Sequence, residues 1–483
     1  MTTSTQVAIE DHALETVPQA DRKNWLALSW NTAGIVTSLV QLFFGALVTF
    51  VAGFRIALCA GVVVTVVGAL LGWACGHVAY KTGLSSTVLS RRHGFGARGS
   101  IISSLIFGFM IIGFLAIENA LLYRGFVFYF HLADTIATRV VVYGLMTVAW
   151  ILLTSYGFSL VAKVSSTMLV LFLAVLAYIS FTVITKAGAT QGALMSFPSQ
   201  WPDAVLATMG ATTVSGKFIF AINVLIGSAG ALALVDADIG RYARRSVDIG
   251  LAALIGNVAM DIVMLAMGGI IMYAGGPALV AFYQSTGLSL GDAQHAALSS
   301  PDSVAAAFII FSGGLGALLM VFAQGKAQVL NTYSASLALS NLVDALGSWR
   351  PGRLTFVVLA NLIGLLMLYG QILALVNSWI TMLGVLTTAF AGVIIADYFI
   401  VRPREAQRAA PSGTDASIDD AESYNWAGIL TTVVAFVASH YVLAGALPVE
   451  FATTLVICLV GYPVLRLTVL RPTRVRVLQR SEA

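Results

Sequence analysis

The sequence consists mainly of apolar segments about 20 residues long, and about twelve of them follow one another along its 483 residues. A helix needs roughly 20 apolar residues to cross a bilayer. Only 10% of the residues are charged, against about 25% in a soluble globular domain. We therefore expect an all-α polytopic membrane protein with about 12 transmembrane helices. The predicted spans are 25–51, 56–80, 100–130, 137–157, 164–186, 216–237, 248–275, 303–337, 354–372, 378–400, 426–445 and 450–470.

The distribution of positive charge predicts the orientation of these spans. With the N-terminus in the cytoplasm, about 20 of the 26 Lys and Arg residues fall in cytoplasmic segments and about five on the opposite side, as the positive-inside rule requires. We expect a multi-pass protein of the plasma membrane with both termini cytoplasmic. Its predicted parts are a tail at 1–24, a ten-helix core at 25–402, a cytoplasmic linker at 403–425, two further helices at 426–470 and a tail at 471–483.

The sequence lacks the common motifs of catalytic and nucleotide-binding sites. It contains no P-loop and no HExxH motif, and its one GxSxG match, at 287–291, lies in the predicted connection 276–302 and not at a strand-to-helix turn. Cys59, Cys75 and Cys458 lie in apolar runs without a CxxC motif or a His partner, which argues against disulfides and a metal site. We therefore expect no enzyme activity, no cofactor and no bound metal. The net charge of +4 reflects topology and not nucleic-acid binding.

One lysine, Lys326, lies in the middle of an apolar stretch from Ala305 to Leu342. A Lys at the centre of a spanning helix costs about 2.5 to 3.5 kcal/mol on insertion scales, so such residues usually face the interior of a bundle and mark a functional site. Polar neighbours give this helix one polar side, and glycines permit close packing or local unwinding. The polar residues are Gln324, Gln328, Asn331 and Thr332, and the glycines are Gly313, Gly314, Gly316 and Gly325.

Two acidic residues inside predicted spans are candidate partners of Lys326. Glu118 lies in the third span and Asp261 in the seventh. A carboxylate at such a depth is a candidate functional group, although a role limited to neutralising Lys326 in a buried pair is equally consistent with the sequence. Asp236 and Asp238 fall at the end of the sixth span, where local ion pairing or a gate is the favoured interpretation.

The first predicted span is interrupted by small and polar residues. They are Asn31, Thr32, Gly34, Thr37, Ser38 and Gln41. Such residues favour a broken helix whose backbone groups face a ligand or an ion. Close packing of neighbouring helices against Gly, Ser and Thr is the alternative interpretation.

Several short motifs follow one another in order at the ends of the predicted spans. They are VPQADRKNWLAL before the first, GHVAYKTGLSS and RRHGFGARGS after the second, DADIGRYAR closing the sixth, NTYSASLALSN in the eighth and GVIIADYFIVRPRE closing the tenth. With these motifs the sequence resembles the nucleobase:cation symporter-1 family, and within it the bacterial cytosine permeases. The resemblance extends from about Val17 to the twelfth span.

The resemblance implies a five-plus-five inverted-repeat transporter fold in which helices 1 and 6 are broken. The substrate then binds near the middle of the membrane, between the first, third, sixth and eighth helices, and crosses by alternating access. Members of the family couple the uptake of purines, pyrimidines, hydantoins, allantoin or related heterocycles to Na+ or H+. The expected function is therefore import of a nucleobase-like or related nitrogen heterocycle.

The resemblance also implies a substrate site, which departs from that of cytosine permease at several positions. The Gln and the stacking Trp of the third helix are Ile111 and Phe114, the stacking Phe beside Ser228 is Ala229, and two base-contacting Asn residues are Ala323 and Gln328. A buried polar group without its partner costs about 1 to 3 kcal/mol, so cytosine is not the expected substrate. We expect the substrate to contact Gln41, Phe114, Ser228 and Gln328, with Glu118 within reach.

The resemblance bears on the coupling ion as well. In sodium-coupled members, two hydroxyl residues of the eighth helix bind the metal opposite carbonyl groups of the first helix, here Gly34 to Ser38; their positions hold Lys326 and Ala327. An ammonium about 4 Å from a sodium ion costs about 4 kcal/mol at an effective dielectric of about 20, so we expect Lys326 to replace the sodium. Proton coupling is the favoured expectation, with Glu118 as the coupled acid ahead of Asp261. A uniporter or an exchanger is the alternative.

Two other classes of function are consistent with parts of this pattern. An amino-acid or amine carrier on the same scaffold would use Glu118 to bind a cationic group and Lys326 to bind an anionic one. A receptor without transport activity, or an enzyme acting on lipid, is disfavoured because the chain has neither an added soluble domain nor a catalytic motif. The expected partners are thus a small heterocycle, a proton and the lipid bilayer.

Overall fold

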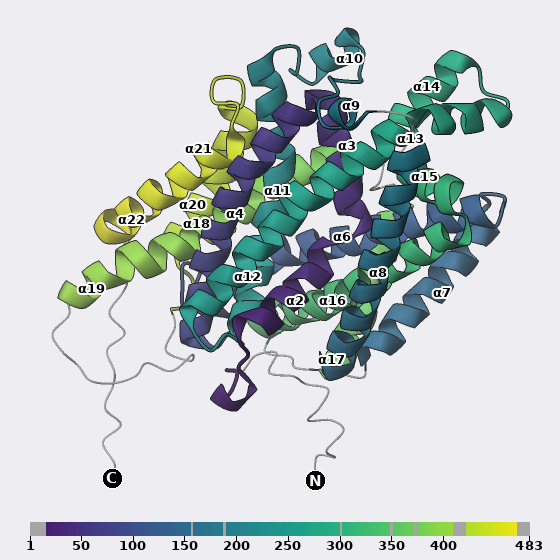
Figure 1. Cartoon of the computed structure of the whole chain (residues 1–483). Coiled ribbons are helices and arrows are strands. Elements are labelled where there is room, and N and C mark those ends of the chain that lie inside the picture. The colour runs from purple at the N-terminus through teal and green to yellow at the C-terminus, as the bar shows by residue number, and fades with distance from the viewer. Residues whose placement is uncertain are drawn as a thin grey trace, which may run out of the picture.

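The computed structural model describes residues 16–155, 158–186, 190–299, 302–347, 351–370, 372, 375–408 and 422–470. Throughout these ranges the chain forms helices and no strand (Figure 1). Within the described residues, eight helices are long and apolar enough to cross a membrane, or nine when the bent pair α2 (Trp25–Val36) and α3 (Leu39–Ala52) counts as one span. Three shorter apolar helices and the longer, more polar α16 (Gly314–Gly347) bring this count close to the twelve predicted spans.

The other helices follow in chain order. They are α4 (Phe54–Thr82), α5 (Ser86–Leu89), α6 (Ser100–Tyr129), α7 (Ile136–Ser155), α8 (Phe158–Lys186), α9 (Gln191–Leu194), α10 (Asp203–Thr208), α11 (Val214–Gly240), α12 (Ser246–Val258), η2 (Ala259–Met264), α13 (Leu265–Ser285), α14 (Leu290–Ser299), α15 (Asp302–Ser312), α17 (Arg353–Tyr369), α18 (Val376–Ala396), η3 (Asp397–Val401), α19 (Arg402–Arg408), α20 (Trp426–Val437), η5 (Ala438–Val442), α21 (Glu450–Val456), η6 (Ile457–Gly461), α22 (Tyr462–Val464) and η7 (Leu465–Val469).

The predicted break in the first helix is confirmed. Helices α2 and α3 meet at an angle of 66°, because Ser38 adopts an extended conformation (φ −117°, ψ 170°). The hydroxyl of Thr37 donates a hydrogen bond to the carbonyl of Ala33 (2.6 Å), so a polar side chain ends α2. The break leaves carbonyl groups of α2 and N–H groups of α3 without helical partners.

The sixth and eighth helices differ from their predictions. The break implied for the sixth helix is absent, because α11 runs unbroken from Val214 to Gly240. Its Gly227 instead permits close packing, since a Cβ there would lie 2.4 Å from the backbone oxygen of Ile380 on α18.

The eighth helix begins at Gly314 and not at 303. Gly313 adopts φ +52°, which glycine tolerates best, and separates α15 from α16.

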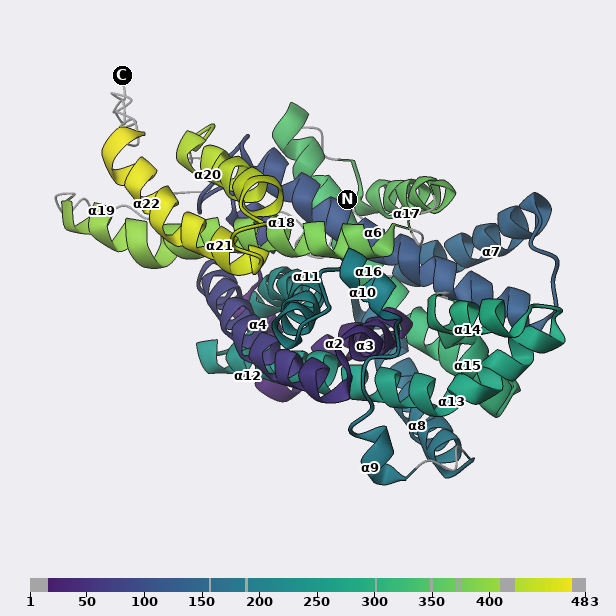
Figure 2. The same ribbon diagram turned by 90° about the horizontal axis from the view of Figure 1, so that it is seen from above.

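Helix α11 lies inside the bundle, with α4 packed along one side and α18 along another (Figure 2). From Ala221 to Asp238 nearly every side chain of α11 is buried. Helices α6 and α16 pack along each other, and α8 packs on α16. Together α2, α3, α6, α11 and α16 therefore surround the interior where the substrate site is expected.

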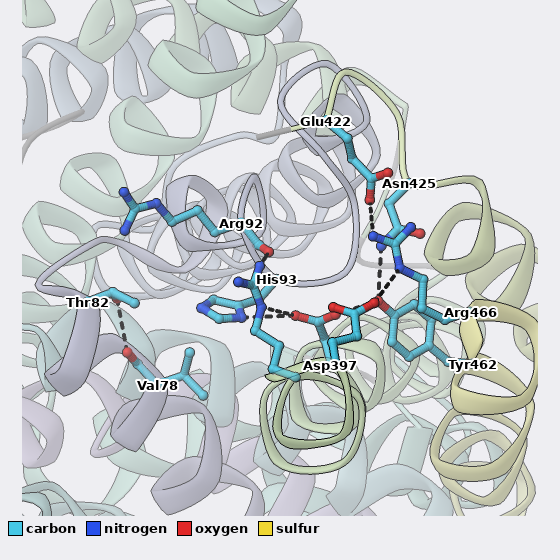
Figure 3. Close-up of polar contacts among 11 residues, drawn as sticks. Val78, Thr82, Arg92, His93, Asp397, Glu422, Asn425, Tyr462 and Arg466 are labelled. Carbon is cyan, nitrogen blue, oxygen red and sulfur yellow. Dashed lines mark hydrogen bonds and ion pairs between the residues drawn. The ribbon is translucent and has the colours of Figure 1, made fainter. Parts of the chain in front are cut away.

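A buried polar cluster joins the last helices to the rest of the bundle (Figure 3). The carboxylate of Asp397 accepts hydrogen bonds from Tyr462 (2.5 Å), Arg402 (3.0 Å) and the His93 ring (3.0 Å). Asn425 in turn donates to the Tyr462 hydroxyl (3.0 Å). One carboxylate thus ties α18, the segment before α6 and the C-terminal helices together.

Candidate functional site

The ammonium group of Lys326 lies at the end of the first half-helix. Its Nζ donates hydrogen bonds to the backbone oxygens of Gly34 (3.1 Å) and Thr37 at the end of α2. It also lies 4.5 Å from the centre of the Phe172 ring on α8, within the range of a cation–π contact. The C-terminus of a helix carries partial negative charge, so this position compensates a lysine that is fully buried.

Glu118 lies at the start of the second half-helix. Its carboxylate interacts with the hydroxyl of Ser38 and the backbone N–H of Val40, where α3 begins. The N-terminus of a helix carries partial positive charge. The break in the first helix therefore places an acid at its positive end and a base at its negative end, and these two side chains interact through space. Atom Oε2 of Glu118 has no hydrogen-bond partner in the described part of the chain.

A cavity opens beside this break, and we call it the first cavity. It is lined by Ile35, Val36, Ser38, Val40, Gln41, Met110, Ile111, Phe114, Glu118, Ser228, Ala231, Leu232, Val235, Met260 and Asn331. The ring of Phe114 meets Trp379 edge-on, with centroids 4.9 Å apart. Buried Ser228 Oγ has no partner among the described residues. Four of the five predicted substrate residues thus lie around one space.

The fifth predicted substrate residue, Gln328, lies outside the lining of this cavity. Its amide nitrogen donates to the backbone oxygen of Leu115 and to Asn119 Oδ1, both at 2.8 Å. In this structure Gln328 therefore holds α16 against α6. Asn331, one helical turn further along α16, lines the cavity and lies 3.4 Å from the Gln328 amide oxygen. The sequence indicates that Asn331 is on the polar side of this helix but does not separate its role from that of Gln328.

Asp261, unlike Glu118, does not line the first cavity. It belongs to η2, which has π-helical geometry, and it is fully buried. Neither of its carboxylate oxygens has a hydrogen-bond partner in the described ranges. The acid that acts on Lys326 is Glu118, while the neighbour of Asp261, Met260, lines the first cavity. The structure thus brings Gly34 and Glu118 to Lys326, and Ser38 to Glu118.

Solved structures of transporters share this architecture. The chain is similar to Mhp1 in its inward-facing conformation, with 18% identity, a TM-score of 0.67 and coverage of 93% of this chain and 91% of that chain. It is also similar to Mhp1 in a closed conformation with bromovinylhydantoin bound, described as a nucleobase-cation-symport-1 family transporter. Here the identity is 17%, the TM-score is 0.66, and the match covers 96% of this chain and 94% of that chain. For a Na+-coupled sialic acid symporter in a substrate-bound outward-open state, the identity is 13% and the TM-score is 0.62. That match covers 95% of this chain and 92% of the other. At these identities the similarity establishes the fold.

Sequence comparison establishes the family. No curated protein sequence matches the chain. The model of a family described as permeases for cytosine/purines, uracil, thiamine and allantoin matches residues 16–464, which include every span of the core. The protein is therefore a transporter that belongs to this permease family, the nucleobase:cation symporter-1 family.

Proposed function

We propose that the protein imports a nucleobase-like or related nitrogen heterocycle across the plasma membrane by alternating access, in symport with protons and independently of sodium. The observation that carries this proposal is the position of Lys326 Nζ between the backbone oxygens of Gly34 and Thr37. The excess of Lys and Arg in the connecting segments on the side of the N-terminus supports a cytoplasmic location for that side.

The first cavity has the chemistry that a flat heterocycle requires. Small-molecule sites combine apolar and aromatic walls with a few converging polar groups. Here Phe114 supplies an aromatic wall that is held by Trp379, while Gln41, Ser228 and Glu118 supply polar groups. A heterocycle against the Phe114 ring would satisfy the unpartnered Ser228 Oγ and Glu118 Oε2 through hydrogen bonds at its edge.

Lys326 excludes a sodium ion from the break in the first helix. The carbonyls that its ammonium binds lie at the end of α2, where sodium-coupled relatives hold their metal. A second cation about 4 Å away would be disfavoured by about 4 kcal/mol at an effective dielectric of about 20, which is about a thousandfold in affinity. Sodium and Lys326 therefore do not share this site.

Glu118 links the substrate to the proton. It follows Phe114 by one turn of α6, so both side chains lie on the same face of the helix, and both line the first cavity. A proton on the Glu118 carboxyl changes its hydrogen bonding with the substrate and its interaction with Lys326 at the same time. Binding of substrate and binding of a proton are thereby coupled.

Uptake into proteoliposomes tests this proposal. Radiolabelled cytosine, adenine, uracil, thiamine and allantoin are offered with sodium replaced by choline, with and without an inward proton gradient. We expect sodium-independent uptake of at least one compound, driven by the proton gradient and lost in Lys326→Ala. Lys163→Ala, which changes an exposed lysine of α8, serves as the control. Strict dependence on sodium would contradict the proposal.

A further inference from the structure

A second cavity adjoins the first. It is lined by α2, α11 and α16, which also line the first cavity, and by Lys23 before α2. Its walls are formed by Lys23, Leu28, Asn31, Ile35, Val235, Asp238, Ile239, Tyr242, Leu330, Tyr333 and Ser334. Ile35 and Val235 line both cavities.

The two cavities are stacked along α11. On this helix the first cavity contacts Ser228 to Val235, and the second begins at Val235 and extends to Tyr242 at the helix end. A shift of seven residues corresponds to about 10 Å along a helix. A compound that leaves the first cavity toward the C-terminal end of α11, where the segment before α2 lies, would therefore pass through the second cavity.

Residues 16–24, which we call the strap, lie at the end of the second cavity. Lys23 of the strap lines the cavity. Its N–H donates to the backbone oxygen of Tyr242 (2.6 Å), and its carbonyl accepts from the N–H of Arg244 (3.0 Å). The second cavity thus lies between the first cavity and the strap.

Asp238 gives the second cavity an unpartnered acceptor. Its Oδ1 accepts a hydrogen bond from the backbone N–H of Ser86 (2.7 Å), whereas Oδ2 has no partner in the described part of the chain. The side chain is 6% exposed. Leaving a buried carboxylate oxygen unbonded is costly, so this atom points to a ligand that donates a hydrogen bond.

A cation outside the lining acts on the acid of each cavity. Arg241 interacts with Asp238 through space and donates to the hydroxyl of Tyr333 (3.1 Å). Lys326 likewise interacts through space with Glu118, which lines the first cavity. A carboxylate whose charge is already compensated gains little from a cationic ligand, but its unbonded oxygen still accepts an N–H group. Both cavities therefore favour neutral N–H donors.

From these observations we infer that the second cavity is a second binding site for the transported compound, and that this compound is a neutral heterocycle that donates N–H hydrogen bonds. The inference rests on the proposed function of the first cavity. In it, Asp238 Oδ2 binds an N–H group of the compound after the compound has passed Ile35 and Val235. Asn31 and Ser334 offer further polar contacts in the same space.

Equilibrium binding to the purified protein tests the inference. The probes are the five radiolabelled compounds used for uptake, and the quantity measured is the number bound per chain with the dissociation constant of each site. We expect two sites in the wild type. Phe114→Ala should weaken one of them, and Asp238→Asn should weaken the other by about tenfold, since a hydrogen bond to a charged carboxylate is replaced by a weaker one to a neutral amide oxygen.

Two further variants keep this experiment decisive. Asp236→Asn is the matched control, because Asp236 lies on the same helix, is fully buried and lines neither cavity; it should leave both sites unchanged. Ser334→Leu fills the second cavity without changing Asp238 and should abolish the same site as Asp238→Asn. If Asp238→Asn does not fold, Ser334→Leu still tests whether the second cavity binds the compound.

The outcomes separate the inference from the function on which it rests. One site per chain, lost in Phe114→Ala and unchanged in Asp238→Asn and Ser334→Leu, would overturn the second site and leave the proposed function standing. Neither binding nor uptake of any compound would overturn both. Binding of thiamine alone, which carries a permanent positive charge, would overturn the assignment to a neutral compound.

Discussion

At the scale of single residues, the aromatic wall of the first cavity makes the sharpest prediction. Phe114→Ala should lower the affinity for a planar substrate by about 0.5 to 1.5 kcal/mol beyond the effect of lost contact area, because an aromatic face is removed. Phe109→Ala is the matched control, since Phe109 also contacts Trp379 but does not line the cavity. Binding isotherms measure both. Equal affinity in the wild type and Phe114→Ala would place the site elsewhere.

A second prediction at this scale concerns which buried acid, Glu118 or Asp261, takes up the coupled proton. Glu118→Gln should abolish accumulation against a gradient and leave exchange intact, because a neutral amide retains hydrogen bonding but cannot take up a proton. Asp261→Asn should retain accumulation, since the acid that acts on Lys326 is Glu118. Counterflow and gradient-driven uptake in the same proteoliposomes distinguish the two processes. The reverse pattern would assign the coupled proton to Asp261.

At the scale of elements, the broken first helix depends on close packing against α8. A Cβ at Gly34 would lie 2.7 Å from Ser165 Oγ. Gly34→Ala should therefore destabilise the protein by about 1 to 3 kcal/mol, and adding Ser165→Ala should restore most of the loss. In Gly108→Ala the new Cβ meets no atom within 4 Å, so this variant should be neutral. Thermal unfolding compares the wild type with the three variants. An unfolding temperature that is unchanged in Gly34→Ala would show that α8 moves aside at no cost in stability.

The two expected breaks show what sequence can predict at this scale. In the first helix, Thr37 and Ser38 stand beside Gly34, and polar side chains there offer the backbone other hydrogen bonds. In the sixth, the run from Gly227 to Ala231 contains no comparable cluster, and contact with Ile380 favours an unbroken helix that packs closely. Glycine alone therefore does not distinguish a break from a contact surface, because the neighbouring helix decides.

At the scale of the whole molecule, the cluster around Asp397 makes stability depend on pH (Figure 3). Burial is the main cause that lowers the pKa of His93 below its ordinary value of 6.5, and the facing Arg402 and Arg92 add to it, while Asp397 opposes. The folded state therefore favours the neutral ring. Its contribution to stability is complete above pH 6.5 and is lost as the pH falls toward the lowered pKa.

The thermal unfolding temperature should accordingly fall as the pH is lowered from about 8 to about 5. His93→Gln should reduce this dependence, because the titrating ring is absent. His131→Gln, at an exposed position, should retain the slope of the wild type. An identical slope in all three proteins would rule out His93 as the source.

The overall architecture could be predicted from the sequence more completely than the site. Apolar segment length indicates spanning helices, and a lone lysine among them marks the interior. The position of Gln328 required tertiary structure, since the amides of Gln328 and Asn331 lie on one side of α16 and only packing against α6 decides which reaches the cavity. Asp238, expected in a local ion pair or at a gate, interacts through space with Arg241 and also lines a cavity, which the sequence does not indicate.

The strap bears on how often a path through the second cavity can open. Three backbone hydrogen bonds tie it to other described residues: Val17 N–H to Gly83, Lys23 N–H to Tyr242 and Arg244 N–H to Lys23. The Arg244 side chain adds a bond to the carbonyl of Arg22 (2.9 Å). At about 0.5 to 1.5 kcal/mol each, the three backbone bonds alone would limit the detached fraction to between about one part in ten and one part in two thousand. If the compound leaves through the second cavity, as we infer, the turnover number contains this fraction as a factor, so a variant with a looser strap would run faster and leak more.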